Sequence, residues 1–198
     1  MSGWVAPTVV RAIAPCVVFA FLGVSAAAAQ SYKEGPESRP FPYVDEIRFG
    51  AFVHQVGGSP GEHGVDVNVE LLTQQLGEPS GDNLRDHFLH PRLHVGGDIN
   101  TDGDTSQAYF GLAWNLPLTN RFFLEASFGG SVNNGYVARE PGHTALGSRL
   151  NFRESASLGF HVSERWDVLA TVDHMSNAGL CTYNRGLTEA GLRVGYKF

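Results

Sequence analysis

Apolar and polar residues alternate along eight stretches of the chain. The alternation is clearest at 65–71, where valine and leucine alternate with acidic and amide side chains, and at 108–116, where large apolar residues recur. Successive side chains of a β-strand point to opposite faces, so a period of two predicts a strand with one apolar and one polar face. The predicted strands cover about 46–54, 65–71, 90–99, 107–116, 121–128, 148–162, 166–177 and 192–198.

The polar faces of these strands carry too much charge for the core of a soluble barrel or sandwich. Arg, Glu, Asp, Asn and His occupy them on nearly every strand, and buried charges are costly unless they are paired. Barrels of the outer membrane reverse the faces, with apolar residues outward and polar residues inward. The chain also ends in Tyr-Lys-Phe at 196–198, resembling the terminal aromatic signature of such barrels. The sequence therefore predicts an all-β fold, an eight-stranded antiparallel transmembrane β-barrel of the bacterial outer membrane.

The lengths of the connections agree with this topology in all but one place. Periplasmic turns are expected to be short, as at 117–120 and 163–165, and an extracellular loop is expected to be long, as at 132–147. The connection at 73–86 should be periplasmic, yet it is long, and the sequence gives no reason for this. Eight strands enclose an interior that side chains can fill, so a porin is not expected.

The N-terminal segment reads as an export signal. Arg11 precedes an apolar run at 12–24 and four alanines that end at Ala29, which predicts a cleaved signal peptide at 1–29. A proline-rich, irregular lead-in at 30–44 follows, and the barrel is expected at 45–198. Cleavage leaves 13 basic and 20 acidic side chains, a net charge of −7, which argues against nucleic acid as a partner. The loss of Cys16 with the signal leaves no cysteine to pair with Cys181.

The strand predicted at 166–177 carries the candidate chemistry. His174 and Ser176 end its otherwise apolar face, where polar groups facing lipid are costly and usually functional. At positions i and i+2 their Cα atoms lie about 7 Å apart, close enough for the imidazole to activate the hydroxyl as a base. A location at the headgroup level, where polar side chains are tolerated, is the alternative interpretation.

The segment His-Met-Ser-Asn at 174–177, with Asn-x-Gly at 184–186, resembles the H-x-S-N and N-x-G of the PagL family of outer-membrane lipid A 3-O-deacylases. Weaker likenesses lie at 64–66 and 146–155. The resemblance implies hydrolysis of the ester-linked acyl chain at the 3-position of lipid A, with lipopolysaccharide of the outer leaflet as the partner. In that family His and Ser act with a Glu, and the Asn after the Ser helps to form the oxyanion hole. These roles fall on His174, Ser176 and Asn177, and we expect the Gly179 backbone N–H as a second oxyanion donor.

Two glutamates are candidates for the acid. The glutamate position of the family falls on Thr188, with Glu189 one residue further along. By parity Glu189 should point into the barrel unless a bulge re-aims it. Antiparallel pairing across the short turn at 163–165 places Glu154 opposite His174. The sequence therefore leaves Glu154 and Glu189 as equal candidates.

No cofactor is expected, and a metal is not required by this chemistry. Histidines 87, 90 and 94 lie close in sequence, but their spacing favours the polar face of a strand over a metal site. Two other functions are kept as alternatives: a non-enzymatic small barrel for adhesion or envelope stability, and a lipid A acyltransferase. The oligomeric state is open, with a homodimer among the options.

Overall fold

The structure is a computed structural model that describes residues 43–57, 61–77 and 84–198. The expected signal peptide at 1–29 and the lead-in as far as residue 42 lie outside the described residues. In the described ranges no helix has the length and apolar character needed to cross a membrane.

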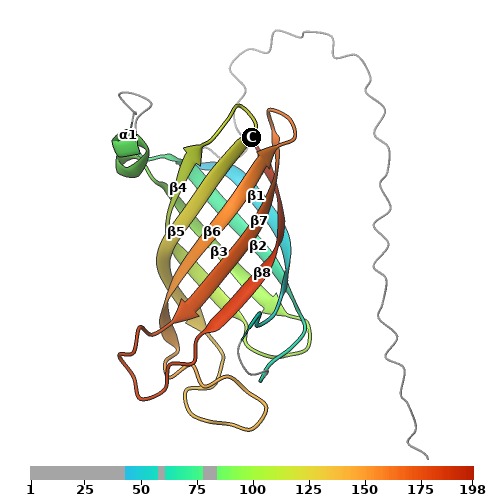
Figure 1. Cartoon of the computed structure of the whole chain (residues 1–198), viewed down its shortest axis with the longest axis vertical. Helices are drawn as coiled ribbons and strands as arrows, with labels where there is room; N and C mark the ends of the chain where they lie inside the picture. Colours follow the sequence, from blue (N-terminus) through green and yellow to red (C-terminus); the bar gives the residue numbers. More distant parts are fainter. Residues whose placement is uncertain (1–42, 58–60, 78–83) are drawn as a thin grey trace, which may run out of the picture. The chain divides into compact units, whose positions relative to one another are not determined.

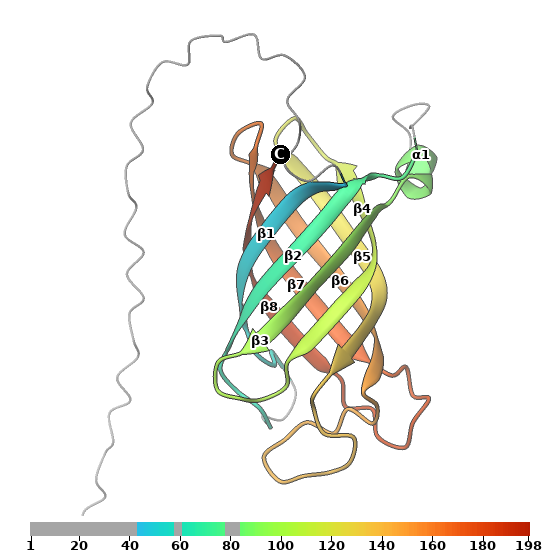
Figure 2. The same ribbon diagram turned by 180° about the vertical axis from the view of Figure 1, so that it is seen from behind.

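Within these ranges eight antiparallel strands close into one barrel, in which the last strand pairs with the first (Figure 1; Figure 2). In chain order they are β1 (Val44–Val53), β2 (Val65–Gln75), β3 (Arg92–Asn100), β4 (Gln107–Pro117), β5 (Phe122–Asn133), β6 (Leu150–His161), β7 (Trp166–Ser176) and β8 (Leu187–Lys197). Closure leaves no strand with unpaired backbone groups in the bilayer, where such groups would lack water as a partner. The predicted fold class is confirmed.

The two faces of the strands have the predicted orientation. Along β7 the side chains alternate between exposed and buried, with Val172 outside and Thr171 and Asp173 inside. Apolar residues thus form the outer wall, while charged and amide side chains fill the interior. This inverted barrel is the arrangement that a lipid bilayer requires.

The barrel interior is held by ion pairs. At its centre the guanidinium of Arg48 contacts Glu46 at 2.6 Å, Glu125 at 2.5 Å and Glu70 at 3.2 Å, and Arg92 reaches the other oxygen of Glu46 at 2.6 Å. Buried charges are tolerated when their partners satisfy them. Fully buried arginine side chains therefore fill the space that a pore would occupy.

The long connection between β2 and β3 contains a short helix, α1 (Leu84–Leu89). The helix lies outside the barrel beside β4, at the end that also holds the C-terminus (Figure 1; Figure 2). Phe88 stacks on Trp114 with ring centroids 5.8 Å apart, and the Trp114 indole N–H donates to the Phe88 carbonyl at 2.9 Å. A helix docked on the outer wall accounts for the length of this connection, which the sequence left unexplained.

Most strands start within two residues of the prediction, and β8 differs most. β3 begins at Arg92, and β8 begins at Leu187, five residues before the predicted start at 192. At the start of β8 the apolar Leu187 faces inward and Thr188 faces outward. Because apolar residues face outward on the other strands, this local reversal kept the alternation from predicting the first half of β8, although its pairing with β7 is continuous.

Candidate active site

The side chains of His174 and Ser176 lie half-buried on the outer wall, where β7 ends at the long loops. This end of the barrel is opposite the C-terminus (Figure 1). Both side chains follow Trp166, Val168 and Val172 along the lipid-facing side of the strand. The predicted placement of a histidine and a serine on one outward face is therefore present in the fold.

Strands β6 and β8 flank His174 on its two sides. On β6 Glu154 is its direct partner across the strands, and Phe152 is the partner of Ser176. The register predicted from the short turn is thus confirmed. On β8 the partner is Thr188, whose hydroxyl oxygen lies 2.7 Å from Nδ1 of His174. Thr188 occupies the position at which the family resemblance places a glutamate.

The bond to Thr188 suits one tautomer of the imidazole. If Nδ1 carries the proton and donates it to the hydroxyl oxygen, Nε2 keeps its lone pair and can act as a base. The other side of the ring is closed by Gly186, where an added Cβ would lie 2.6 Å from Cε1 and 3.0 Å from Nε2 of His174. Gly186 also has a φ of +68°, so both its backbone and the imidazole beside it require glycine.

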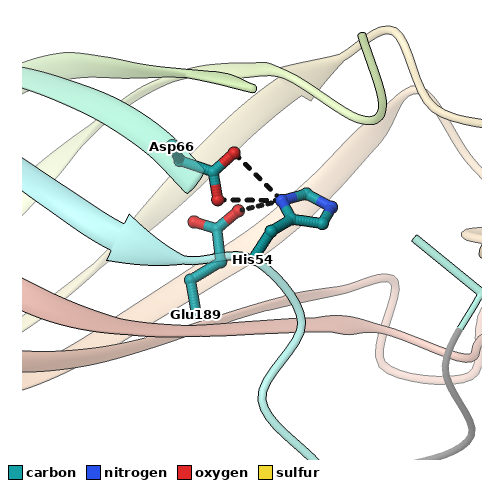
Figure 3. Close-up of side chains that lie close together, drawn as sticks. All are labelled: His54, Asp66 and Glu189. Atoms are coloured by element: carbon teal, nitrogen blue, oxygen red, sulfur yellow. Dashed lines mark hydrogen bonds and ion pairs between the residues drawn. The ribbon is translucent and has the colours of Figure 1, made fainter. Parts of the chain in front are cut away.

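Glu189 lies on the opposite face of β8 from Thr188. It is buried in the barrel, with Asp173 as its partner across the strands. One carboxylate oxygen is 3.4 Å from Nδ1 of His54 (Figure 3), and the other accepts a hydrogen bond from Gln107 at 3.3 Å. The strand continues without the bulge that would re-aim this side chain. The structure therefore brings Glu154, and not Glu189, to the side of the sheet that holds His174.

The side chain of Asn177 ties two loops together. Its Nδ2 donates to the carbonyl oxygens of Leu146 and Tyr183, each at 2.7 Å, and its backbone N–H donates to Oδ1 of Asn184 at 2.9 Å. Asn177 is 3% exposed. Both amide hydrogens are engaged, so in this arrangement the side chain holds the loops at 134–149 and 177–186 and is not directed at an oxyanion.

Gly179 and Ala178 form a left-handed turn directly after Asn177. Their φ angles are +78° and +54°, a conformation that glycine adopts freely and residues with a Cβ adopt at a cost. The space beside the Gly179 Cα is open to at least 4 Å. The backbone of this turn is therefore accessible, unlike the Asn177 amide.

A small apolar core supports these loops from beneath. Leu146, Met175 and Leu187 contact one another and are at most 1% exposed. Together with this core, Asn184 and Gly186 hold the loop at 177–186 against the end of β7. The Asn-x-Gly signal in the sequence identified these positions, but the carbonyl partners of Asn177 on a distant loop had no sequence signal.

A hydrophobic groove of about 510 Å³ lies on the outer wall next to this site. Gly129 and Gly130 of β5 belong to its lining, together with aromatic and aliphatic side chains and residues of the loop after β7. The lining includes Phe110, Phe128, Val132, Leu150, Phe152, Asn177, Leu180 and Cys181.

The three closely spaced histidines lie in different environments. His87 is part of α1, His90 follows this helix, and His94 faces into the barrel, where its Nδ1 lies 2.8 Å from Glu70. Among the described residues none of these histidines belongs to a cluster with the geometry of a metal site.

The fold and this site define an outer-membrane-type β-barrel with a serine and a histidine on its lipid-facing wall. The family model for "Lipid A 3-O-deacylase (PagL)" matches residues 65–197. The chain therefore belongs to the lipid A 3-O-deacylase (PagL) family. No curated protein matches the sequence of the chain.

A solved structure of an outer membrane enzyme has the same fold. The crystal structure of the outer membrane enzyme PagL aligns with a TM-score of 0.57 and 20% identity, over 76% of this chain and 99% of that one. A designed transmembrane β-barrel aligns with a TM-score of 0.49 and 12% identity, over 80% of this chain and 98% of that one. The Yersinia pestis outer membrane protein Ail aligns with a TM-score of 0.46 and 13% identity, over 79% and 99%.

Proposed function

We propose that this protein is a lipid A 3-O-deacylase, a serine hydrolase that removes the ester-linked acyl chain at the 3-position of lipid A in the outer leaflet. One observation carries the proposal beyond family membership. His174 and Ser176 share an outward face at the loop end of β7, where a membrane lipid reaches them from the side. A hydrolase of a soluble substrate would have no reason to place its nucleophile there.

In the proposed reaction Ser176 Oγ attacks the ester carbonyl carbon while Nε2 of His174 takes the hydroxyl proton. The tetrahedral intermediate collapses, the bond to the sugar oxygen breaks, and the imidazolium returns its proton to that oxygen. Water then attacks the acyl-serine, again with His174 as the base. The products are a free fatty acid and 3-O-deacylated lipid A.

Thr188 and Glu154 assist His174 in different ways. Thr188 is a positioning residue, because its hydroxyl holds Nδ1 at 2.7 Å and fixes the tautomer that leaves Nε2 free as a base. Glu154 is exposed and lies across from His174 on β6. Its charge stabilises the imidazolium that forms during the reaction without a direct bond to Nδ1.

The backbone of the left-handed turn supplies the oxyanion site in this proposal. Gly179 is exposed, with nothing within 4 Å of the position that a Cβ would take, and the negative oxygen of the intermediate requires a preorganised donor such as its N–H. Asn177 contributes by fixing the turn, since its side chain anchors the loop through the Leu146 and Tyr183 carbonyls. This assigns to Asn177 a supporting role in place of the direct one implied by the resemblance.

The groove on the outer wall is suited to an acyl chain. It is lined by Phe110, Phe128 and Phe152 and opens beside Asn177. Phe152 pairs with Ser176 across the strands, so a chain in the groove would bring its ester end next to the nucleophile. Such a chain enters from bilayer hydrocarbon and not from water, so packing against these side chains, and not the hydrophobic effect, would hold it in the groove.

The proposed location follows from the same features. The N-terminal 29 residues direct export and are cleaved, and the barrel then inserts in the outer membrane with its long loops outward. In this orientation His174 and Ser176 meet the outer leaflet, which contains the lipopolysaccharide.

Mass spectrometry of lipid A tests the proposal. Purified protein in detergent is incubated with lipid A, and the expected product has lost one 3-linked acyl chain, which appears as free fatty acid. Ser176→Ala and His174→Ala should each lower the rate by at least about a thousandfold, while heat-dependent migration in gels shows that each variant still folds as a barrel. An unchanged lipid A mass with folded wild-type protein would contradict the proposal. Recovery of the chain on another lipid would indicate a transferase instead.

A further inference from the structure

Three buried carboxylates meet inside the barrel directly behind the candidate active site. Asp98 of β3, Asp173 of β7 and Glu189 of β8 are each 1% exposed. One oxygen from each lies within 4.8 Å of the others. Cross-strand pairing brings Asp173 and Glu189 together, and Asp98 reaches them across the interior.

Each of the three carboxylates has at least one oxygen that accepts no hydrogen bond. Asp98 Oδ1 accepts a hydrogen bond from Asn68 at 2.6 Å, Glu189 Oε2 accepts one from Gln107 at 3.3 Å, and Asp173 Oδ2 forms an ion pair with Arg153 at 3.0 Å. Among the described residues, Asp98 Oδ2, Glu189 Oε1 and both oxygens of Asp173 accept no hydrogen bond, although Glu189 Oε1 lies 3.4 Å from Nδ1 of His54. Buried polar atoms of this kind are rare in folded proteins and point to a missing partner.

Gln107 provides a second and independent sign of a ligand. It is 6% exposed, lies opposite Asp98 in the pairing of β3 with β4, and bonds Glu189 through Nε2. Its carbonyl oxygen Oε1 has no hydrogen-bond partner among the described residues. An amide carbonyl has no proton of its own and is a good ligand for a hard cation.

When ionised, the three carboxylates outnumber the cationic groups beside them. They face the guanidinium of Arg153, which also stacks on the Tyr109 ring at 3.7 Å, and the ring of His54, which is shared with Asp66 and Glu62. The other arginine nearby, Arg193, is engaged by Asn68 at 2.9 Å and Glu70 at 3.4 Å. Uncompensated charges in a barrel interior are strongly destabilising.

We propose that Asp98, Asp173 and Glu189 bind one hard divalent cation, Ca²⁺ or Mg²⁺, with the Gln107 carbonyl as a fourth oxygen ligand. Both ions prefer carboxylate and carbonyl oxygens. The three carboxylate oxygens lie within 4.8 Å of one another, a spacing compatible with an ion at the usual Ca–O or Mg–O distance of about 2.0–2.6 Å. The ion supplies the positive charge that the cluster lacks.

The nearby His54 is held by other acids. Its Nδ1 lies 2.8 Å from Asp66 (Figure 3), and its Nε2 lies 3.1 Å from Glu62. Two carboxylates at opposite ring nitrogens suit an imidazolium that donates from both. Glu189 Oε1 lies farther from Nδ1, at 3.4 Å, and forms no hydrogen bond with it. His54 is therefore a cation for Asp66 and Glu62, and Glu189 Oε1 stays available to the metal ion.

A chain of acids connects the cluster with the loops. Asp104 and His143 lie at the mouth of the barrel, with side chains 18% and 30% exposed, and Glu62 lies next to both, buried. Glu62, Asp66 and Glu189 each contact the ring of His54, which links the mouth to the cluster. Closely spaced negative charges raise the local concentration of cations, so the mouth of the barrel is a route of entry.

The proposed ion would support the active site through the barrel wall. Asp173 precedes His174 on β7, and Glu189 follows Thr188 on β8. The two inward acids and the two outward residues belong to adjacent cross-strand pairs. A cation that holds the inward pair together thus fixes the separation of β7 and β8 at the point where Thr188 bonds His174.

Titration of the folded full-length barrel in detergent tests the proposal without any substrate, so its result does not depend on the proposed activity. After treatment with EDTA and dialysis, the protein is titrated with CaCl2 and with MgCl2 separately in a calorimeter. We expect one ion bound per chain for at least one of the two metals, and a rise in unfolding temperature of at least about 3 °C. Absence of saturable binding of both metals overturns the proposal.

Variants locate the ion. Glu189→Gln and Asp98→Asn should each abolish binding and the temperature shift, and two variants allow for the failure of one to fold. Asp167→Asn is the matched control, because this buried acid is paired with Lys197 at the other end of the barrel, and it should keep the ion. Binding that survives both Glu189→Gln and Asp98→Asn but is lost in Asp104→Asn would place the ion at the mouth and overturn the interior site.

Discussion

The Nδ1 atom of His174 lies 2.7 Å from the hydroxyl oxygen of Thr188. Thr188 stands where the family resemblance places a glutamate, so the imidazole has an uncharged partner at Nδ1. A hydroxyl can fix the tautomer of the ring, but it cannot neutralise the imidazolium that forms when the ring accepts a proton. Thr188 can therefore orient the imidazole as a carboxylate would, but any negative charge that stabilises the imidazolium must come from another residue.

Substitutions at Thr188 separate these two effects. Thr188→Val should lower kcat by about tenfold, the effect of one neutral hydrogen bond, while Thr188→Ser, which keeps the hydroxyl, should restore most of the activity. Thr188→Glu should raise kcat above wild type, because a hydrogen bond to a charged group is stronger. The pH profile of kcat should also shift to higher pH in Thr188→Glu. Full activity of Thr188→Val would show that this contact has no part in catalysis.

Glu154→Gln should lower kcat by no more than about fivefold. The carboxylate faces His174 across β6 and β7, but it is exposed, and charges near solvent interact weakly. The effect should shrink at high salt, because the attraction is screened. The control is Glu164→Gln, an exposed acid in the turn at the opposite end of the barrel. A loss of a thousandfold or more in Glu154→Gln would mean that Glu154 bonds the ring directly in the substrate complex.

Asn177→Ala should loosen both loops at the mouth of the barrel. The change leaves the Leu146 and Tyr183 carbonyls without their donor, at a cost of about 1–3 kcal/mol for each buried group. We expect faster proteolysis at 134–149 and 177–186 and a kcat reduced by about a hundredfold. Asn120→Ala, in an exposed turn at the opposite end of the barrel, is the control. Lost activity with unchanged proteolysis would instead assign the amide a direct contact with the oxyanion.

Acid should weaken the hydrogen bonds by which Glu62 holds two connections, the one between β3 and β4 at Thr105 and the one between β5 and β6 at Thr144. Burial, the largest influence, would raise the pKa of Glu62, but hydrogen bonds from His54, Thr144 and Thr105 lower it to about 2. Because the folded-state pKa is below the ordinary 4.5, the carboxylate stabilises the fold above that pH, and this stabilisation is lost as the pH falls towards 2.

Hydrogen exchange measures this loss. Amide protection factors at Thr105 and Thr144, which donate to Glu62, should be constant above the ordinary carboxyl pKa and fall below it, while β5 amides stay protected. In Glu62→Gln the two loop amides should show the lower protection at neutral pH as well. Protection that is independent of pH in the wild type would show that another contact closes the loop.

The alternation of residues sufficed to predict the barrel, because a period of two is the direct consequence of strand geometry between lipid and a polar interior. A short turn fixes the register of the strands that it joins, so the turn at 163–165 was enough to predict that Glu154 lies opposite His174. The start of β8 was missed because Leu187 faces inward and Thr188 outward, against the rule that located the other strands.

The interior contacts had no comparable signal. Parity shows that Asp98, Asp173 and Glu189 point inward, but their meeting depends on the stagger of strands that are distant in sequence. The same holds for the amide of Asn177, whose partner Leu146 lies on another loop. Local patterns determine which way a side chain points, while the closure of the barrel determines what it contacts.

His174 and Ser176 lie on the outer wall of a barrel whose interior is filled. Under the proposed function, substrate arrives only by sideways movement within the leaflet, so the encounter is a two-dimensional search. Its frequency depends on the number of lipid A molecules per unit area of membrane. Mixing lipid A with an inert lipid at a fixed bulk concentration would slow turnover, whereas diluting the whole suspension would leave turnover unchanged. The turnover rate of this protein would therefore depend on the lipid composition of the membrane that surrounds it.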